Sequence, residues 1–286
     1  MQWTALLRKK SGLTLIELMV ALVICALLVG AVYRTFINQG KTYTIQDNVV
    51  DMQQSARFAI GRMTREIRTA GFGGVARVLP VQFGTVTLNN IINPDTPVPG
   101  ALSIVEAGTE AASLTTPAAR PDSQIIVSTL TDSQGNPLFD TNARRYLSID
   151  GLECHEIASI ASNTNTITLK DSLLYNHAVN TSVYAVRMIT YQVVNQAGTP
   201  QLARDDNTGQ GSQPEADYIE TIQFAYYDAT GTVTTAPNAR MIKVSLTART
   251  PQSDPDLKGG DGYRRRNLST YVQMKDIGLD QQQGGV

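Results

Sequence analysis

An uninterrupted apolar stretch near the N-terminus constrains this chain more than any other feature. From Leu13 to Tyr33 the sequence reads LTLIELMVALVICALLVGAVY, 21 residues that include one charge, Glu17. At about 1.5 Å per residue, a helix of this length spans roughly 30 Å, the thickness of the hydrocarbon core of a bilayer. Arg8, Lys9 and Lys10 precede the stretch, and basic residues favour the cytoplasmic side. We therefore expect a cytoplasmic N-terminus and an exported C-terminal body.

A secretory signal peptide and an ordinary membrane anchor are the two simplest alternatives. The apolar region of a secretory signal has roughly 7–15 residues and ends at a small-residue cleavage site. Here the run is longer, and Arg34, Thr35 and Phe36 follow it. An ordinary anchor leaves Glu17 unexplained, because a carboxylate within an apolar span costs about 2.5–3.5 kcal/mol on insertion scales. The cost is lower near the interface, so the anchor remains an alternative.

The sequence KKSGLTLIEL, residues 9–18, resembles the class III signal of type IV prepilins and pseudopilins. In that family a basic leader ends in glycine, an apolar residue follows, and a glutamate stands five residues after the cut. The resemblance implies that a membrane-embedded prepilin peptidase cuts between Gly12 and Leu13 and methylates the new amino group of Leu13. The family's commonest residue after the cut is Phe, so Leu13 is a departure. The glutamate is Glu17.

The resemblance also gives Glu17 a role in assembly. A buried carboxylate can be compensated by an opposite charge. In a bundle of laterally packed helices, the Leu13 amine of one subunit can meet Glu17 of its neighbour. Because such a pair rewards one axial stagger over others, we expect Glu17 to specify the register of the subunits.

A single helix is expected to run from about Leu13 to Ala70, since no proline occurs before Pro80. Beyond the apolar run, apolar or small residues recur at steps of three or four, which is one face of a helix. These residues are Ile45, Val49, Met52, Ala56, Ala59 or Ile60, Met63, Ile67 and Ala70. Gly71, Gly73 and Gly74 then provide stop signals.

The end of this helix carries a second resemblance. The stretch QQSARFAIGRMTREIRTAGFGG, residues 53–74, resembles PilW-type minor pilins, which place an ARFA…R…IR.AG(F/Y) block at this point. The simpler interpretation is an amphipathic helix end in which Phe58 and Ile67 are core residues, and both interpretations are compatible.

From Pro80 onward, β-branched and aromatic runs separated by turn residues predict a β-rich head. The expected strands are 124–130, 145–149, 164–170, 182–194, 201–204, 217–227, 240–248 and 268–275. Residues 84–123 read mostly as loop, and residues 205–216 and 250–262 read as exposed loops.

The order of elements over 182–275 again resembles PilW-type and J-type heads, in which these strands form an antiparallel sheet on the long helix. Residues 124–182 then form an added small β-subdomain. The expected fold class is α+β, pilin-like, with a long N-terminal helix and an antiparallel head. The expected parts are a cleaved leader (1–12), the membrane or filament-core half of the helix (13–37), its amphipathic half (38–72) and a periplasmic head (73–286).

Catalytic and metal-binding patterns are not apparent in the sequence. Cys25 lies in the apolar run and Cys154 in the expected head, so the two cannot form an intramolecular disulfide. Cys154 is expected to be a buried thiol. Neither of the two histidines, His155 and His177, has a ligand-spaced partner, which favours structural roles. Asp254, Asp256 and Asp261 match no defined calcium loop. Arg264, Arg265 and Arg266 favour a solvated face over contact with DNA.

These features and resemblances together favour a PilW-type minor pilin of a type IV pilus, a structural subunit that primes or caps pilus assembly. The expected partners are the prepilin peptidase, the inner membrane, and other minor pilins and the major pilin through the N-terminal helix. No cofactor, metal or nucleic acid is expected, consistent with a net charge of -1. The head would be periplasmic before assembly and part of the pilus afterwards, with the tip as one candidate position.

Three alternatives remain. A J-type minor pseudopilin of a type II secretion system shares the same architecture. A surface adhesin or DNA-uptake pilin at the tip would bind its ligand, or DNA, through the head. A membrane-anchored periplasmic enzyme has no catalytic set to support it, so we expect no enzymatic activity.

Overall fold

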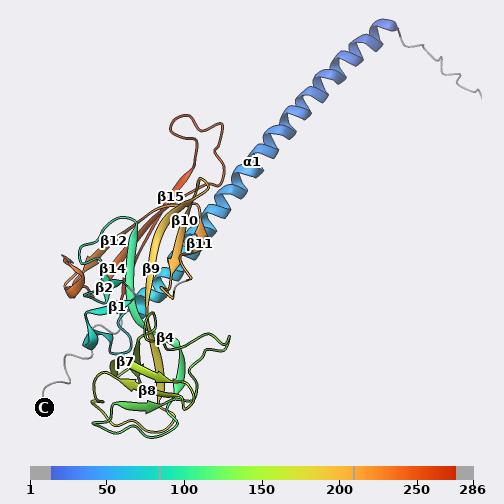
Figure 1. Cartoon of the computed structure of the whole chain (residues 1–286). Helices are drawn as coiled ribbons and strands as arrows, with labels where there is room; N and C mark the ends of the chain where they lie inside the picture. Colours follow the sequence, from blue (N-terminus) through green and yellow to red (C-terminus); the bar gives the residue numbers. More distant parts are fainter. Residues whose placement is uncertain (1–13, 84, 209, 275–286) are drawn as a thin grey trace, which may run out of the picture. The chain divides into compact units, whose positions relative to one another are not determined.

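One long helix, α1 (Leu15–Thr69), precedes a head of antiparallel sheets, and the chain is α+β as predicted (Figure 1). The computed structural model describes residues 14–83, 85–208 and 210–274. Two compact units make up the chain, Met1–Val50 and Asp51–Val286, so α1 continues from the first unit into the second. The predicted helix over Leu13–Ala70 is confirmed to within two residues at its start and one at its end.

One face of the second half of α1 is buried. The buried residues are Met52, Ala56, Ala59, Met63, Glu66 and Ile67. This face agrees with the predicted spacing, and its alanines let the sheet approach the helix backbone closely. Phe58 is 54% exposed, so its expected place in the core was wrong, whereas Ile67 is fully buried. Phe58 lies one residue before Ala59, and adjacent helical positions point in different directions.

The chain leaves α1 through a glycine-rich turn that lies directly against strand β4 (Ala101–Ser113). The Gly71 N–H donates to the Val105 carbonyl oxygen at 2.8 Å, and the Ala107 N–H donates to the Phe72 carbonyl oxygen at 2.9 Å. Gly73 has φ +97°, and a Cβ added there would lie 2.4 Å from Ala107 Cβ. Only glycine fits this position, which accounts for the stop signal in the sequence.

The other elements of the described head range from two to 15 residues in length. The strands other than β4 are β1 (Val81–Phe83), β2 (Val86–Leu88), β3 (Ile92–Asn93), β5 (Gln124–Ile126), β6 (Tyr146–Ile149), β7 (Glu153–Ala161), β8 (Thr166–Leu169), β9 (Ser182–Gln196), β10 (Thr199–Asp205), β11 (Gln213–Asp217), β12 (Ile219–Tyr227), β13 (Val233–Thr234), β14 (Met241–Arg249) and β15 (Arg265–Gln273). Two 3-10 helices, η1 (Val75–Val78) and η2 (Ala236–Asn238), complete the described elements.

Strand β9 organises a nine-stranded sheet of order β11-β10-β9-β6-β7-β8-β5, to which β4 and β3 are added. Its first half pairs with β6 over Val183–Val186, and its second half pairs with β10 over Thr190–Gln196. Strand β4 pairs with β9 from Ser182 to Gln192. One continuous strand therefore belongs both to the part of the head that contacts α1 and to the part formed by residues 124–182.

Residues 112–185 surround a hydrophobic core of their own, built around Leu147, Ile149, Ile157, Ile167 and Val183. This agrees with an added β-subdomain, but it is continuous with the main sheet through β9.

The strands of 182–275 are divided between two sheets instead of forming the one sheet that the resemblance implied. Strands β12, β14 and β15 form a separate four-stranded sheet with β13, in the order β13-β12-β14-β15. The division falls at Tyr218, between β11 and β12, which has φ +62°. A bulky residue in this left-handed conformation is unusual, and no glycine at this position marks the turn in the sequence.

Loop predictions for 84–123 and 205–216 were wrong in part. Residues 84–123 contain the 13-residue strand β4, and Gln213–Ala216 belong to β11. Strand β4 reads ALSIVEAGTEAAS, and its alanines, glycine and glutamates have low strand propensity. Pairing with β9 stabilises β4, and that contact is invisible to a local reading of the sequence.

A buried carboxylate joins α1 to the nine-stranded sheet. The Tyr191 hydroxyl of β9 donates to Glu66 Oε2 at 2.7 Å, and Arg204 Nε of β10 lies 3.2 Å from both Glu66 oxygens. Arg62 forms an ion pair with Glu66 at 3.4 Å. Burial, followed by the adjacent Glu66 carboxylate, raises the pKa of Tyr191, so this tyrosine remains a hydrogen-bond donor.

A second buried carboxylate holds the last turn of α1. Arg187 of β9 donates to Glu106 Oε1 of β4 from Nη2 at 2.7 Å and from Nε at 3.2 Å. The Thr69 hydroxyl of α1 donates to Glu106 Oε2. Glu66 and Glu106 thus fix the helix to three neighbouring strands.

We predict that Glu66→Gln lowers the free energy of unfolding of the head by about 3–5 kcal/mol, because the largely buried Arg204 loses its counter-charge. The matched control is Glu215→Gln, since Glu215 forms only a long, 3.9 Å ion pair with Arg62 and should cost at most about 1 kcal/mol. Chemical denaturation of the full chain in detergent, followed by near-UV circular dichroism, measures both. Equal losses of unfolding free energy in the two variants would show that the Glu66 contact stabilises the head no more than a long ion pair does.

Candidate functional site

The start of α1 forms a capping box between Thr14 and Glu17. The Thr14 N–H and hydroxyl each donate to Glu17 Oε2 at 2.9 Å, and the Glu17 N–H lies 3.4 Å from Thr14 Oγ1. The Leu18 N–H donates to the Thr14 carbonyl oxygen, which is the first bond of the helix. This T-x-x-E pattern satisfies backbone donors that a helix leaves free at its start. The pattern is visible in the sequence, although Thr14 was not among the predicted site residues.

Glu17 keeps one oxygen available for another contact. Its Oε2 accepts both bonds from Thr14, and Oε1 has no hydrogen-bond partner among the residues that the structure describes. The other residues predicted for processing, Gly12 and Leu13 at the cut and Arg8, Lys9 and Lys10 in the leader, lie outside the described residues.

The first half of α1 exposes apolar side chains in every direction. They run from Leu15 through Val20, Leu27 and Val32 to Phe36, and none of the described residues before Thr44 is even partly buried. By length and composition, α1 contains a segment that can cross a membrane, with a mean hydropathy of 2.8. A helix that is hydrophobic all round requires an apolar environment outside its own chain.

A third buried carboxylate, Glu153 of β7, lies in the β-subdomain. His155 Nε2 is 2.9 Å from Glu153 Oε2, and His177 Nε2 is 2.5 Å from Glu153 Oε1. The Leu174 N–H also donates to Oε2, at 2.8 Å, and the Tyr175 N–H donates to Oε1, at 3.4 Å. Glu153 therefore holds the segment between β8 and β9 against β7.

The structural role expected for the histidines is consistent with this cluster, but the sequence did not show that both contact Glu153. Glu153 and His155 are two residues apart on a strand and so share one face, whereas His177 arrives from a separate segment. Both imidazoles bind the carboxylate directly. Within the described ranges, no three His, Cys, Asp or Glu side chains are placed to hold a metal ion.

Cys154 points to the other side of β7 and packs with Val105, Tyr146 and Met188. It is buried, as predicted, and burial raises the pKa of its thiol. Cys25 is an exposed free thiol on α1. The thiolate is the reactive form of cysteine, and burial disfavours it at Cys154.

Two aspartates of the loop over 250–262, Asp254 and Asp261, pair with the arginines that follow it. Arg264 donates to Asp254 Oδ2 from Nη2 at 2.6 Å, and Arg265 pairs with Asp261 and with Glu220. Asp254 is buried, so the prediction of an exposed loop over 250–262 was wrong for this residue. The pairs stabilise the connection between β14 and β15.

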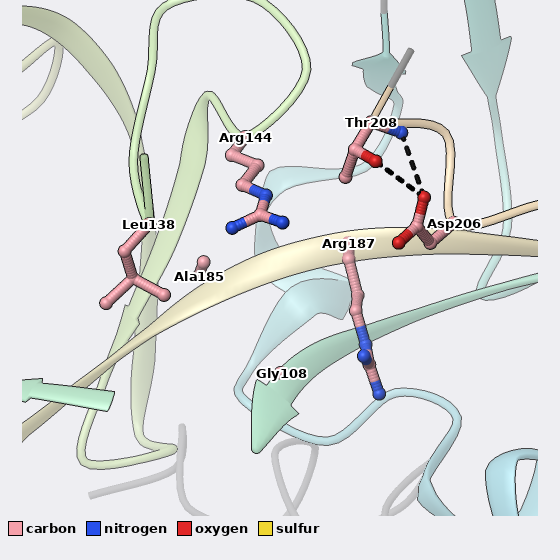
Figure 2. A pocket seen from close by; sticks show the side chains of 7 residues that line it. All are labelled: Gly108, Leu138, Arg144, Ala185, Arg187, Asp206 and Thr208. Atoms are coloured by element: carbon pink, nitrogen blue, oxygen red, sulfur yellow. Dashed lines mark hydrogen bonds between the residues drawn. The ribbon is translucent and has the colours of Figure 1, made fainter. Parts of the chain in front are cut away.

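A small hollow of about 120 Å³ lies beside β9 in the head (Figure 2). Its lining consists of Gly108, Leu138, Arg144, Ala185, Arg187, Asp206 and Thr208. Figure 2 shows the Arg144 guanidinium between Leu138 and Asp206, while Arg187 extends from β9 toward Gly108. None of these residues was singled out from the sequence, because they come from four separate segments.

Residues 7–33 match the prokaryotic N-terminal methylation motif. No curated protein sequence matches the chain. The structure is similar to that of a type IV-like pilin from Thermus thermophilus, at 15% sequence identity and a TM-score of 0.21, over 32% of this chain and 68% of that chain. The chain thus carries a prepilin-type methylation motif on an apolar helix that is followed by antiparallel sheets.

The Glu153 cluster makes the stability of the folded head depend on pH in the acidic range. Burial opposes ionisation, but hydrogen bonds from His155, His177 and the Leu174 N–H outweigh it and hold the Glu153 pKa at about 2, against 4.5 for an ordinary glutamate. A carboxyl whose pKa is lowered on folding stabilises the folded state above pH 4.5, and this contribution is lost as the pH falls toward 2.

We expect Glu153→Gln to destabilise the head by at least about 2 kcal/mol at pH 7 and to flatten the decline in stability between pH 4.5 and 2. Thermal unfolding across this pH range measures both effects. Glu156→Gln is the comparison variant on β7: burial opposes ionisation of Glu156, but its pairs with Lys170 and Arg145 lower its pKa as well. Because Glu156 is more exposed than Glu153, its replacement should change the acid limb less. An unchanged acid limb in Glu153→Gln would contradict the assignment.

Proposed function

We propose that this protein is a PilW-type minor pilin of a type IV pilus, processed at Gly12–Leu13 and assembled through the first half of α1. The observation that carries the proposal is the methylation motif over residues 7–33, followed by an apolar helix with a carboxylate in its first turn. A structural subunit with this signal needs a membrane before assembly and apolar helical neighbours afterwards.

The exposed first half of α1 supports assembly with similar helices. Its apolar side chains have no cover from the rest of the described chain. In a bilayer, lipid covers them, and in a filament the helices of other pilins replace the lipid. The second half of α1 is instead fixed to the head by Glu66 and Glu106, so the head travels with the helix as one assembly subunit.

The free oxygen of Glu17 supports the pairing role. In the single chain, the capping box uses Oε2 and leaves Oε1 for the methylated amine of a neighbouring Leu13. The capping box also satisfies the carboxylate while no neighbour is present, which reduces the cost of keeping it in an apolar span. The same carboxylate then serves the membrane-bound subunit and the assembled one.

The assignment as a minor pilin, and as a subunit of a pilus in place of a secretion system, rests on the sequence resemblances. The ARFA block at 53–74 and the order of head strands favour a PilW-type subunit that primes or caps assembly with other minor pilins. A J-type minor pseudopilin of a type II secretion system is the second candidate, because its head has a similar strand order. In either case the partners are the prepilin peptidase and other pilins, and the head is periplasmic before assembly.

The test compares Glu17→Gln with Thr14→Val. Losing a buried ion pair costs about 3–5 kcal/mol, whereas losing a helix cap costs about 1 kcal/mol. We expect Glu17→Gln to insert and be cleaved normally but to be strongly depleted from sheared pili and from pull-downs with other minor pilins. Thr14→Val should retain most of its incorporation, because its Glu17 carboxylate remains.

The readout is the ratio of protein in sheared pili, or in minor-pilin pull-downs, to processed protein in the membrane. Equal incorporation of Glu17→Gln and the natural chain would exclude the pairing role. Equal depletion of both variants from the pili would show that Glu17 acts only by capping the helix. Recovery with secretion pseudopilins in place of pilus subunits would favour the second candidate.

A further inference from the structure

The hollow beside β9 contains opposite charges that face each other without pairing. Among the ion pairs of the described residues, none joins Arg144 to Asp206. Yet the two groups interact: burial opposes ionisation of Asp206, while hydrogen bonds from Thr208 and the charges of Arg204 and Arg144 lower its pKa. Both residues line the hollow, and Figure 2 shows the Arg144 guanidinium and the Asp206 carboxylate apart from each other.

Each of these two groups has hydrogen-bonding capacity left over. Arg144 uses Nη1 to donate to the Pro137 carbonyl oxygen at 2.7 Å, and its Nε and Nη2 have no partner within the described part of the chain. Asp206 Oδ1 accepts from the Thr208 N–H and hydroxyl, and Oδ2 has no partner within the same residues. A donor fork and an acceptor oxygen therefore remain for a third group.

Arg187, the other cation of the lining, is already committed. It donates from Nε and Nη2 to the buried Glu106. Its charge is neutralised there, so Arg144 is the cation that can take a new anion. Leu138 and Ala185 give the hollow an apolar side next to Arg144.

The size limits the ligand to a small molecule. The hollow has a volume of about 120 Å³. Sites for drug-sized ligands begin at about 300 Å³. A small ligand that satisfies both charged groups carries an anion for Arg144 and a hydrogen-bond donor for Asp206.

We propose that the hollow binds a small α-amino or α-hydroxy acid. Its carboxylate accepts from Nε and Nη2 of Arg144, because a guanidinium fork matches a carboxylate in two parallel hydrogen bonds. Its α-ammonium or α-hydroxyl donates to Asp206 Oδ2, and its short side chain lies against Leu138 and Ala185. This binding activity is separate from assembly through α1 and gives the head a ligand-sensing or ligand-binding role.

The test is calorimetric titration of the full-length chain in detergent with L-alanine, L-lactate and acetate. We expect alanine and lactate to bind more tightly than acetate, which lacks a donor for Asp206. Arg144→Gln should weaken all three ligands, and Asp206→Asn should weaken alanine and lactate but not acetate. The expected loss is at least about tenfold for each charge-assisted contact.

Arg120→Gln is the matched control, since Arg120 is exposed and lies outside the lining; it should leave every affinity unchanged. Circular dichroism checks that each variant is folded. If Arg144→Gln does not fold, Arg144→Lys replaces it, because lysine keeps the charge but lacks the two-donor fork. Absence of saturable binding up to about 10 mM alanine and lactate would overturn the proposal. Equal affinities for the three ligands, or affinities insensitive to Arg144, would also overturn it.

Discussion

The buried contact of Glu66 with Tyr191 and Arg204 is the interaction on which the arrangement of the head depends. It places a charged residue of α1 against β9 and β10, where an unpaired carboxylate would be costly. Strand β9 then carries β4 along one edge and both β10 and β6 along the other. The contact that holds the helix thus reaches the β-subdomain through a single continuous strand.

The local features of this fold were predictable, and its long-range contacts were not. The period of the buried face of α1 and the glycines after Thr69 gave the helix and its end, and all eight expected strands exist. Strand β4 was missed because ALSIVEAGTEAAS is stabilised by its neighbours and has weak strand propensity of its own. The division into two sheets depends on the left-handed Tyr218, for which the sequence has no marker.

The same distinction applies to the candidate sites. Glu17 was predictable because a lone charge in an apolar run is conspicuous, and Thr14 was readable from its spacing to Glu17. Glu66, Glu106 and Glu153 look like ordinary charged residues in sequence, yet all three are buried and join segments far apart in the chain. The Arg144–Asp206 hollow was equally unreadable, because only the folded head brings its two charges together.

Processing of the N-terminus tests the central claim most directly. Intact-mass and N-terminal peptide measurements on the protein, purified from cells that contain a prepilin peptidase, give the first residue and its modification. The account predicts a chain that lacks residues 1–12 and begins at N-methylated Leu13. A chain that retains residues 1–12, or one cut beyond the apolar segment, would contradict it and would identify the segment as an ordinary anchor or a secretory signal.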